Sequence, residues 1–336
     1  MSIQFAINGF GRIGRMVLRA VLQRQEKDIE VVAINDLDSP DTLAHLFQYD
    51  SVHGNWPGTV AHKENAIIID GKEFRVLAER DGAKLPLQAL GIDVVLECTG
   101  KYTTREKAEL LLKAGAKKVL ISAPGKGVDM TMAYGINHKA YQPQKHHIIS
   151  NASCTTNCLA PVAKVLDDTF GIVHGLMTTI HSYTNDQRIL DLVHSDKRRA
   201  RAAAMSMIPS TTGAAKAIGE VLPGLKGKLN GSAIRVPTPN VSLVDLTVQL
   251  HKATTVESIN AAMKAAAHEE LKGVLQYDDA PTVSIDYNDN PHSSIFDSTQ
   301  TSLIDGTFAK VFAWYDNEWG YSNRMVDVAK FLASAK

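Results

Sequence analysis

The N-terminal stretch decides the fold class, because residues 3–14 read Ile-Gln-Phe-Ala-Ile-Asn-Gly-Phe-Gly-Arg-Ile-Gly. Its first half is apolar, as is typical of a buried strand, and a helical pattern continues from its end to Gln23. Gly9, Gly11 and Gly14 therefore form G-x-G-x-x-G between a strand and a helix, the setting that a dinucleotide site requires. The spacing predicts a tight turn, close approach of a pyrophosphate, and close packing of the helix on the strand.

Polar residues at the ends of later strands extend this predicted site. A second apolar run ends at Asp36, about 20 residues past the glycines, where a carboxylate binds the ribose hydroxyls of NAD. Thr99 and Gly100 follow a further buried strand, and Ser122 ends the next one. Ligands bind at the carboxyl ends of parallel strands, so these three residues are candidate cofactor contacts, with ordinary turn residues as the alternative.

A second stretch carries reactive chemistry, since residues 150–158 read Ser-Asn-Ala-Ser-Cys-Thr-Thr-Asn-Cys. Ser153 is an N-cap residue type before an apolar helical pattern, which predicts Cys154 at the first turn of a helix, where a thiol ionises more easily. The alternatives are a small buried hydrophobe, or a metal site or disulfide with Cys158. Helical spacing without a further nearby Cys argues against a closed zinc site, so no metal is expected.

The second half of the chain supplies possible partners for Cys154. A strand over residues 173–180 delivers His181, for which a hydrogen-bonded core histidine is the alternative. The polar segment 183–201 is long and irregular, which is typical of functional or interface segments. Residues 210–213 read Ser-Thr-Thr-Gly before a helix and predict a phosphate-sized cradle. Further strands at 246–250 and 310–315, a loop at 316–321 and a helix at 323–335 predict an α+β second half, with its sheet covered on one face.

Composition limits the class of protein. The 336 residues suggest two domains, and 36 basic residues balance 36 acidic ones, which does not favour a nucleic-acid or membrane partner. Three cysteines form no disulfide framework, and the N-terminus enters a strand without a signal-like apolar run. We expect a cytoplasmic protein.

The chain resembles phosphorylating glyceraldehyde-3-phosphate dehydrogenases over essentially its whole length. The Ser-Asn-Ala-Ser-Cys-Thr-Thr-Asn run is highly specific to that superfamily. The other matching stretches are residues 6–15, 177–187, 198–203, 210–216, 235–245 and 314–324.

The resemblance implies the roles of individual residues. Cys154 would be the nucleophile and His181 the base that activates it. Cofactor contacts would come from Arg12, Ile13, Asp36, Arg80, Ser122 and Asn317, beside the glycine motif. One anion site would be formed by Ser153, Thr155, Thr212 and Gly213 for the attacking phosphate, and another by Thr184 and Arg235 for the substrate phosphate, with Arg201 joining one of them.

The resemblance also implies the architecture and the reaction. We expect an α/β Rossmann-type dinucleotide-binding domain over residues 1–152, with a C-terminal helix at about 317–336 packed back on it, and an α+β catalytic domain with a mixed or antiparallel sheet over 153–316. The expected enzyme is an NAD-dependent homotetrameric oxidoreductase of glycolysis and gluconeogenesis, which converts glyceraldehyde 3-phosphate and inorganic phosphate through a cysteine thioester. The alternatives are an erythrose-4-phosphate dehydrogenase and a catalytically silent NAD-binding regulator. Ser182 and Val193 depart from the Ala and Pro that many members carry.

Overall fold

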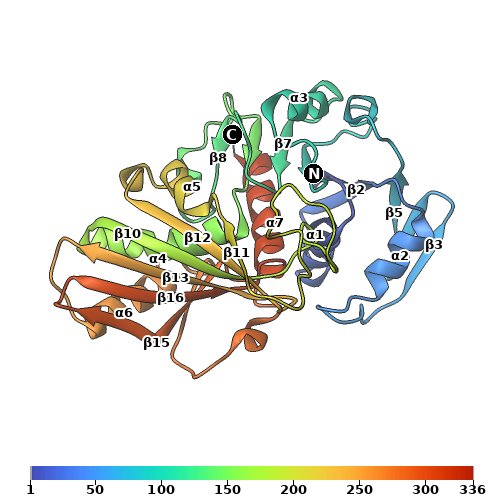
Figure 1. Ribbon diagram of the computed structural model, residues 1–336. Coiled ribbons are helices and arrows are strands. Elements are labelled where there is room, and N and C mark those ends of the chain that lie inside the picture. The colour runs from blue at the N-terminus through green and yellow to red at the C-terminus, as the bar shows by residue number, and fades with distance from the viewer. Residues whose placement is uncertain (1, 336) are drawn as a thin grey trace. The chain divides into compact units, whose positions relative to one another are not determined.

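A computed structural model describes residues 2–335, which divide into two compact units (Figure 1). Of these residues, unit 1 takes 2–132, 140–152 and 322–335, and unit 2 takes 133–139 and 153–321. None of the helices formed by residues 2–335 is both long enough and apolar enough to cross a membrane.

Unit 1 is built on a nine-stranded sheet, ordered β3-β4-β5-β2-β1-β6-β7-β9-β8. The central strand β1 (Ile3–Asn8) pairs in parallel with β2 (Ile29–Asn35) and with β6 (Val94–Glu97). An antiparallel hairpin over β4 and β5 turns at Asp70 and Gly71, both in the left-handed region, so the sheet is mixed. The other strands are β3 (Val60–Lys63), β4 (Ala66–Ile69), β5 (Lys72–Leu77), β7 (Lys118–Ile121), β8 (Met130–Thr131) and β9 (Ile148–Ser150).

Helix α3 (Arg105–Lys113) of unit 1 buries an apolar stripe against the sheet. Ala108 and Leu111 of α3 pack with Val95 and Val119 of the central strands in one buried cluster. Burial of such stripes is the main favourable term in folding. The other helices are α1 (Arg12–Gln23), α2 (Pro40–Gln48) and most of α7 (Trp319–Ser334).

Unit 2 is built on a seven-stranded mixed sheet, ordered β11-β12-β10-β13-β16-β15-β14. Its longest central strand, β10 (Ile172–Ser182), pairs in parallel with β12 and antiparallel with β13. In Figure 1, β10, β13, β16 and β15 lie side by side. The other strands are β11 (Ile208–Thr211), β12 (Leu229–Val236), β13 (Ser242–Leu250), β14 (Leu275–Asp278), β15 (Ser294–Ile304) and β16 (Phe308–Tyr315).

Three helices cover one face of the second sheet: α4 (Cys154–Phe170), α5 (Ala214–Val221) and α6 (Val256–His268). On the other side Leu176 and Phe308 are 68% and 44% exposed, and burial alternates along β13, so this face is the more open one. The predicted fold class, an α/β dinucleotide-binding part and an α+β part with a mixed sheet, is confirmed.

One helix boundary differs from the sequence-based predictions. Helix α7 begins at Trp319, within the predicted loop 316–321, because Asp316 Oδ1 accepts hydrogen bonds from the backbone N–H groups of Glu318 (2.9 Å) and Trp319 (2.7 Å). Helix α4 continues through Pro161 to Phe170, although an interior proline removes one backbone hydrogen bond.

Candidate active site

Cys154 is the first residue of helix α4, as the sequence predicts. Ser153 is the N-cap with extended backbone, and its hydroxyl accepts a hydrogen bond from the N–H of Thr156 at 3.1 Å. This cap ends the preceding strand and starts the helix, so the half-buried Cys154 thiol lies beside the unpaired N–H groups of the first turn.

His181 lies near the end of β10, with its Nε2 3.6 Å from the Sγ atom of Cys154. Its Nδ1 lies 2.7 Å from the carbonyl oxygen of Ser182, which can only accept, so Nδ1 carries the proton. Arg235 Nη1 lies 3.1 Å from the same Nδ1, and its proton therefore goes to the Ser182 oxygen at 3.2 Å. This tautomer presents an unprotonated Nε2 to the thiol.

Burial decides the protonation of both groups. Burial, with the positive charge of Arg235 added to it, lowers the pKa of His181 to about 3, so the imidazole is neutral near pH 7. Burial also raises the pKa of Cys154, against the opposing charge of Arg235 and the hydrogen bonds of Thr155. Desolvation therefore acts against the easier ionisation that the helix start predicts for this thiol.

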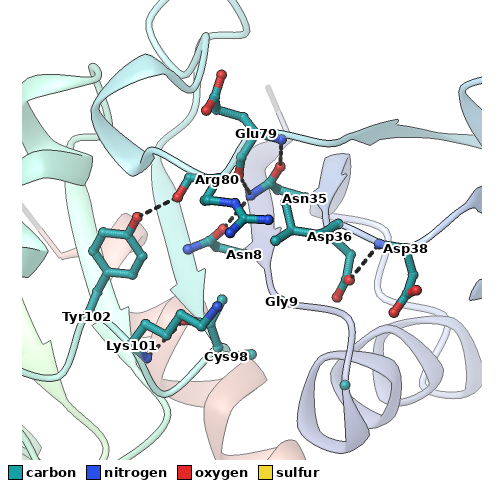
Figure 2. A pocket seen from close by; sticks show the side chains of 13 residues that line it. Asn8, Gly9, Asn35, Asp36, Asp38, Glu79, Arg80, Cys98, Lys101 and Tyr102 are labelled. Atoms are coloured by element: carbon teal, nitrogen blue, oxygen red, sulfur yellow. Dashed lines mark hydrogen bonds between the residues drawn. The ribbon is translucent and has the colours of Figure 1, made fainter.

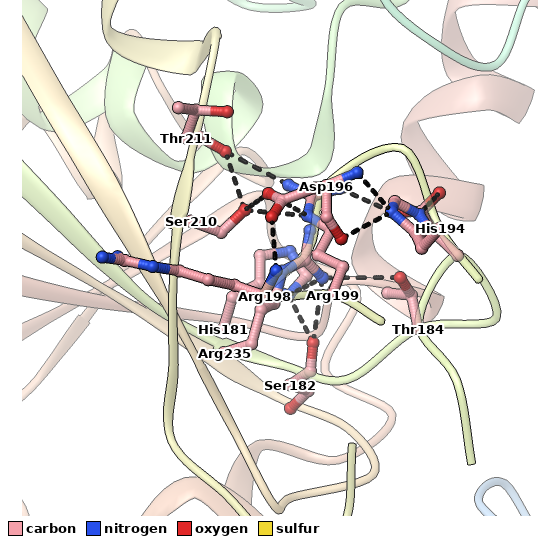
Figure 3. A network of polar contacts seen from close by, with 11 residues as sticks. His181, Ser182, Thr184, His194, Asp196, Arg198, Arg199, Ser210, Thr211 and Arg235 are labelled. Atoms are coloured by element: carbon pink, nitrogen blue, oxygen red, sulfur yellow. Dashed lines mark hydrogen bonds and ion pairs between the residues drawn. The ribbon is translucent and has the colours of Figure 1, made fainter. Parts of the chain in front are cut away.

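Arg235 joins this pair through strand pairing. It lies on β12 directly beside His181 of β10 in the parallel register, and its Nη1 also donates to the Thr184 hydroxyl at 3.4 Å (Figure 3). The structure thus brings together Thr184, Arg235 and His181. The family resemblance implies that the first two bind the substrate phosphate and that His181 is the base.

A different arginine from the predicted one joins the network. Arg199 donates to Asp186 at 2.6 Å and to the Ser210 hydroxyl at 2.8 Å, and its charge acts on both His181 and Arg235 (Figure 3). Arg201 is exposed and instead donates to Asp191 at 2.7 Å. Sequence reasoning missed Arg199, although the basic group 198–201 is the signal that pointed to this segment.

The remaining predicted phosphate residues lie at two helix starts. Thr212 accepts a hydrogen bond from the Ala214 N–H at 3.2 Å, and Gly213 is exposed at the start of α5, which packs against α4. The Thr155 hydroxyl is buried and bonds to the Tyr315 hydroxyl at 2.8 Å. The backbone N–H of Thr155, in the first turn of α4, is a further donor that can face an anion.

Unit 1 holds the predicted cofactor pocket, a cavity of about 370 Å³ at the carboxyl edge of its parallel strands (Figure 2). The predicted residues that line it are Gly9, Gly11, Asp36, Arg80 and Thr99. The Asp36 carboxylate accepts from the N–H of Phe10 at 2.7 Å, so it holds the glycine turn as well as facing the pocket.

The space around each glycine of the motif explains why a side chain is absent there. Gly9 has φ +94°, and a Cβ there would lie 2.8 Å from the backbone nitrogen of Thr99. A Cβ on Gly14 would lie 2.1 Å from the carbonyl oxygen of Gly9, so helix and turn could not approach as they do. At Gly11 nothing lies within 4 Å, which leaves open space for a group against the backbone. These residues fit a dinucleotide.

The other predicted cofactor residues do not line this cavity. Arg12 pairs with Asp50, Ile13 lies in α1 and Ser122 follows β7, while Gly100 is exposed in the turn after β6. Asn317 belongs to unit 2, where its Oδ1 accepts from the Ser242 hydroxyl at 2.8 Å.

A buried polar network that reaches the pocket at Asn8 and Asn35 was missed by sequence reasoning. Asn35 donates to Asn8 at 2.8 Å, and Asn8 donates to the carboxylate of Glu97. Burial raises the pKa of Glu97, although hydrogen bonds from Thr99 and Asn8 act against it. An asparagine at the end of two adjacent buried strands was the available signal.

Both units match families of known proteins. Residues 3–105 match the family described as "Glyceraldehyde 3-phosphate dehydrogenase, NAD binding domain", and residues 153–317 match its "C-terminal domain". Proteins named glyceraldehyde-3-phosphate dehydrogenase from Geobacillus stearothermophilus and Xanthobacter flavus are 60% and 58% identical, over 99% and 98% of this chain and of their own lengths. "Glyceraldehyde-3-phosphate dehydrogenase 1" of Bacillus cereus is 58% identical over 98% of both chains.

Proposed function

Because the chain belongs to the glyceraldehyde-3-phosphate dehydrogenase family, we propose that it oxidises glyceraldehyde 3-phosphate with NAD and inorganic phosphate to 1,3-bisphosphoglycerate, in glycolysis and gluconeogenesis. The observation that carries the proposal is the 3.6 Å approach of Cys154 Sγ to an unprotonated His181 Nε2. That distance suits proton transfer from a nucleophile to its base.

The first chemical step forms a bond between Cys154 Sγ and the aldehyde carbon. His181 Nε2 accepts the thiol proton and returns it to the aldehyde oxygen, which gives a thiohemiacetal. The raised pKa of Cys154 means that a free thiolate is costly in this buried site. Transfer of the proton as the carbon–sulfur bond forms avoids that cost.

The second step converts the adduct to a thioester. Bound NAD supplies the hydride acceptor. His181 Nε2 accepts the hydroxyl proton as the C–H bond breaks, which its lowered pKa allows because the imidazole is neutral beforehand. In the first step, negative charge develops on the aldehyde oxygen, and the backbone N–H of Cys154 and the imidazolium that carries the thiol proton are the donors proposed for it.

The third step uses two separate anion sites. Thr184 and Arg235 are proposed to hold the substrate phosphate, since Arg235 is a half-buried cation beside His181. Ser153, Thr212, Gly213 and the Thr155 N–H are proposed for the attacking phosphate, whose oxygen displaces Cys154 and forms the acyl phosphate. Two anions in one pocket repel, so each needs its own donors.

Assembly and location extend the proposal. We propose a homotetramer, with the segment 183–201 near the cofactor of a neighbouring subunit, because Ile189 and Val193 are 87% and 84% exposed. Two functional domains are proposed at 1–152, joined by the C-terminal helix, and at 153–316. A cytoplasmic location agrees with three free cysteines.

The test is NADH formation with glyceraldehyde 3-phosphate, with and without inorganic phosphate, against erythrose 4-phosphate. We expect a phosphate-dependent reaction that prefers the three-carbon substrate. Equal or better turnover of erythrose 4-phosphate would contradict the proposed substrate, and the absence of both reactions would contradict the enzyme itself.

A further inference from the structure

A chain of buried hydrogen bonds runs behind His181 within unit 2. The Ser182 N–H donates to the Ser242 hydroxyl at 3.1 Å, and this hydroxyl donates to Asn317 Oδ1 at 2.8 Å. Ser182, Ser242 and Asn317 are 0%, 1% and 6% exposed. Water does not compete well at such sites, so each bond fixes the geometry of its partners.

The same serine also holds a strained backbone. The Ser182 hydroxyl donates to the carbonyl oxygen of Val241 at 2.7 Å, and Val241 has φ +64° at 3% exposure. A β-branched residue in the left-handed region is strained, and such strain persists only where surrounding contacts enforce it. The Ser182 hydroxyl is one of those contacts, and it fixes the position of the neighbouring Ser242.

The chain ends on two groups with proposed roles in the reaction. At one end the Ser182 carbonyl accepts from His181 Nδ1 and so sets the tautomer of the base. At the other end Ser242 occupies Oδ1 of Asn317, which leaves the Nδ2 amide as the end that can donate to a ligand.

We propose that Ser182 and Ser242 are positioning residues, which hold His181 and the predicted cofactor contact Asn317 in one hydrogen-bonded unit. This inference rests on the proposed function for the roles of His181 and Asn317. A shift at either serine then affects both the orientation of the base and the presentation of the amide.

The experiment compares Ser182→Ala and Ser242→Ala with Ser298→Ala in the full-length protein. Ser298 is a matched control, because its buried hydroxyl also donates to a carbonyl oxygen, that of Asp278 at 2.8 Å, on strands β15 and β14. Three quantities are measured: the melting temperature, the rate of Cys154 alkylation by iodoacetamide without cofactor, and the NAD dissociation constant. Peptide mass spectrometry distinguishes Cys154 from Cys98 and Cys158.

We expect Ser182→Ala and Ser298→Ala to lose similar thermal stability, since each loses one buried hydrogen bond, and Ser242→Ala to lose more, since it loses two. Ser182→Ala and Ser242→Ala should each slow the alkylation of Cys154 and raise the NAD dissociation constant, both by about threefold to tenfold. Ser298→Ala should leave both quantities at the wild-type values.

Wild-type-like alkylation and NAD affinity in both site variants would overturn the inference. A change in only one variant would overturn the single connected unit. The proposed function is judged separately by wild-type dehydrogenase activity, because alkylation and NAD binding are measured without turnover.

Discussion

The cofactor pocket of unit 1 and the cysteine site of unit 2 use burial in opposite ways. In the pocket, backbone N–H groups, Asp36 and Arg80 face open space, and the glycines remove side chains from it. At the cysteine site, burial raises the pKa of Cys154 and lowers that of His181, so it favours the neutral form of both groups. One region recognises a ligand by shape, and the other controls reactivity by excluding water.

The largest expected effect is a loss of activity from a change at the cysteine site that leaves the cofactor pocket unaffected. Cys154→Ser should reduce dehydrogenase activity by about 10⁴-fold or more, because no other group replaces the nucleophile. NAD binding and the melting temperature should stay near the wild-type values. Cys158→Ser is the control, since that thiol is fully buried and donates weakly to the Ala313 carbonyl at 3.5 Å. Equal losses of activity in both variants would contradict the assignment of the nucleophile.

The next effect tests the charge within the cysteine site. Arg235→Ala should raise the KM for the aldehyde by about 10- to 100-fold, since a charge-assisted hydrogen bond contributes about 1.5–3 kcal/mol. The NAD dissociation constant should change little. Arg105→Ala removes an exposed arginine paired with Asp129 in unit 1 and should leave the KM unchanged. An unchanged KM in Arg235→Ala would show that another cation holds the substrate phosphate.

The third prediction tests the charge of Asp36 in the cofactor pocket, as the second tests the charge of Arg235 at the cysteine site. Asp36→Asn should weaken NAD binding by about tenfold and bring NADP closer to it, because a neutral amide no longer repels a 2′-phosphate. The Asn oxygen still accepts from Phe10, so the turn is kept. Asp38→Asn is the matched control, because Asp38 lines the same pocket and is exposed. Equal changes in cofactor preference in both variants would mean that the response is only to net charge.

The pocket was predictable from sequence because its parts are local. Gly9, Gly11 and Gly14 lie in one turn, and Asp36 ends the next strand, so period and spacing place all four. The hairpin at Asp70 and Gly71 was predictable for the same reason. Local pattern does not extend to β15, whose polar alternation lacks a strong strand signal, or to the Asp316 cap that starts α7 early.

The cysteine site was predictable only in part, because tertiary contacts decide it. Cys154 and His181 follow from a helix start and a strand end. The choice of Arg199 over Arg201 depends on which one reaches Asp186 and Ser210 across the segment. The Thr155 hydroxyl points to Tyr315, which no local pattern indicates.

A fourth prediction compares the acid sensitivity of the two units. The pKa of His181 falls from 6.5 to about 3 on folding, so the unfolded chain binds more protons between these two pH values. The free energy of unfolding therefore decreases as the pH is lowered through this window. Hydrogen bonds from His53, Arg12 and Val52 lower the pKa of Asp50 from 3.8 to about 2 despite burial, so its contribution is lost only below pH 3.8.

Urea unfolding at pH 7 and pH 5 checks this difference. Wild type should lose up to about 2 kcal/mol of unfolding free energy from His181 between these values, and His181→Asn should lose correspondingly less. Asp50→Asn should change the dependence only at lower pH. The same decrease in wild type and in His181→Asn would show that the histidine is not buried in its neutral form.

The smallest expected effect distinguishes a phosphate site from a helix cap. Thr212 and Thr255 each accept one N–H at a helix start, from Ala214 and from Ser258, both at 3.2 Å. Replacing either by Ala should therefore lower stability by about 1 kcal/mol. Only Thr212→Ala should also slow the attack of phosphate on the thioester, by a few-fold, because one hydrogen bond to an anion is lost. The pre-steady-state NADH burst precedes that attack, so it should keep its rate and amplitude. A Thr212→Ala variant with a normal phosphate dependence, like that of Thr255→Ala, would reduce Thr212 to a structural cap and leave Gly213 and the start of α4 as the donors.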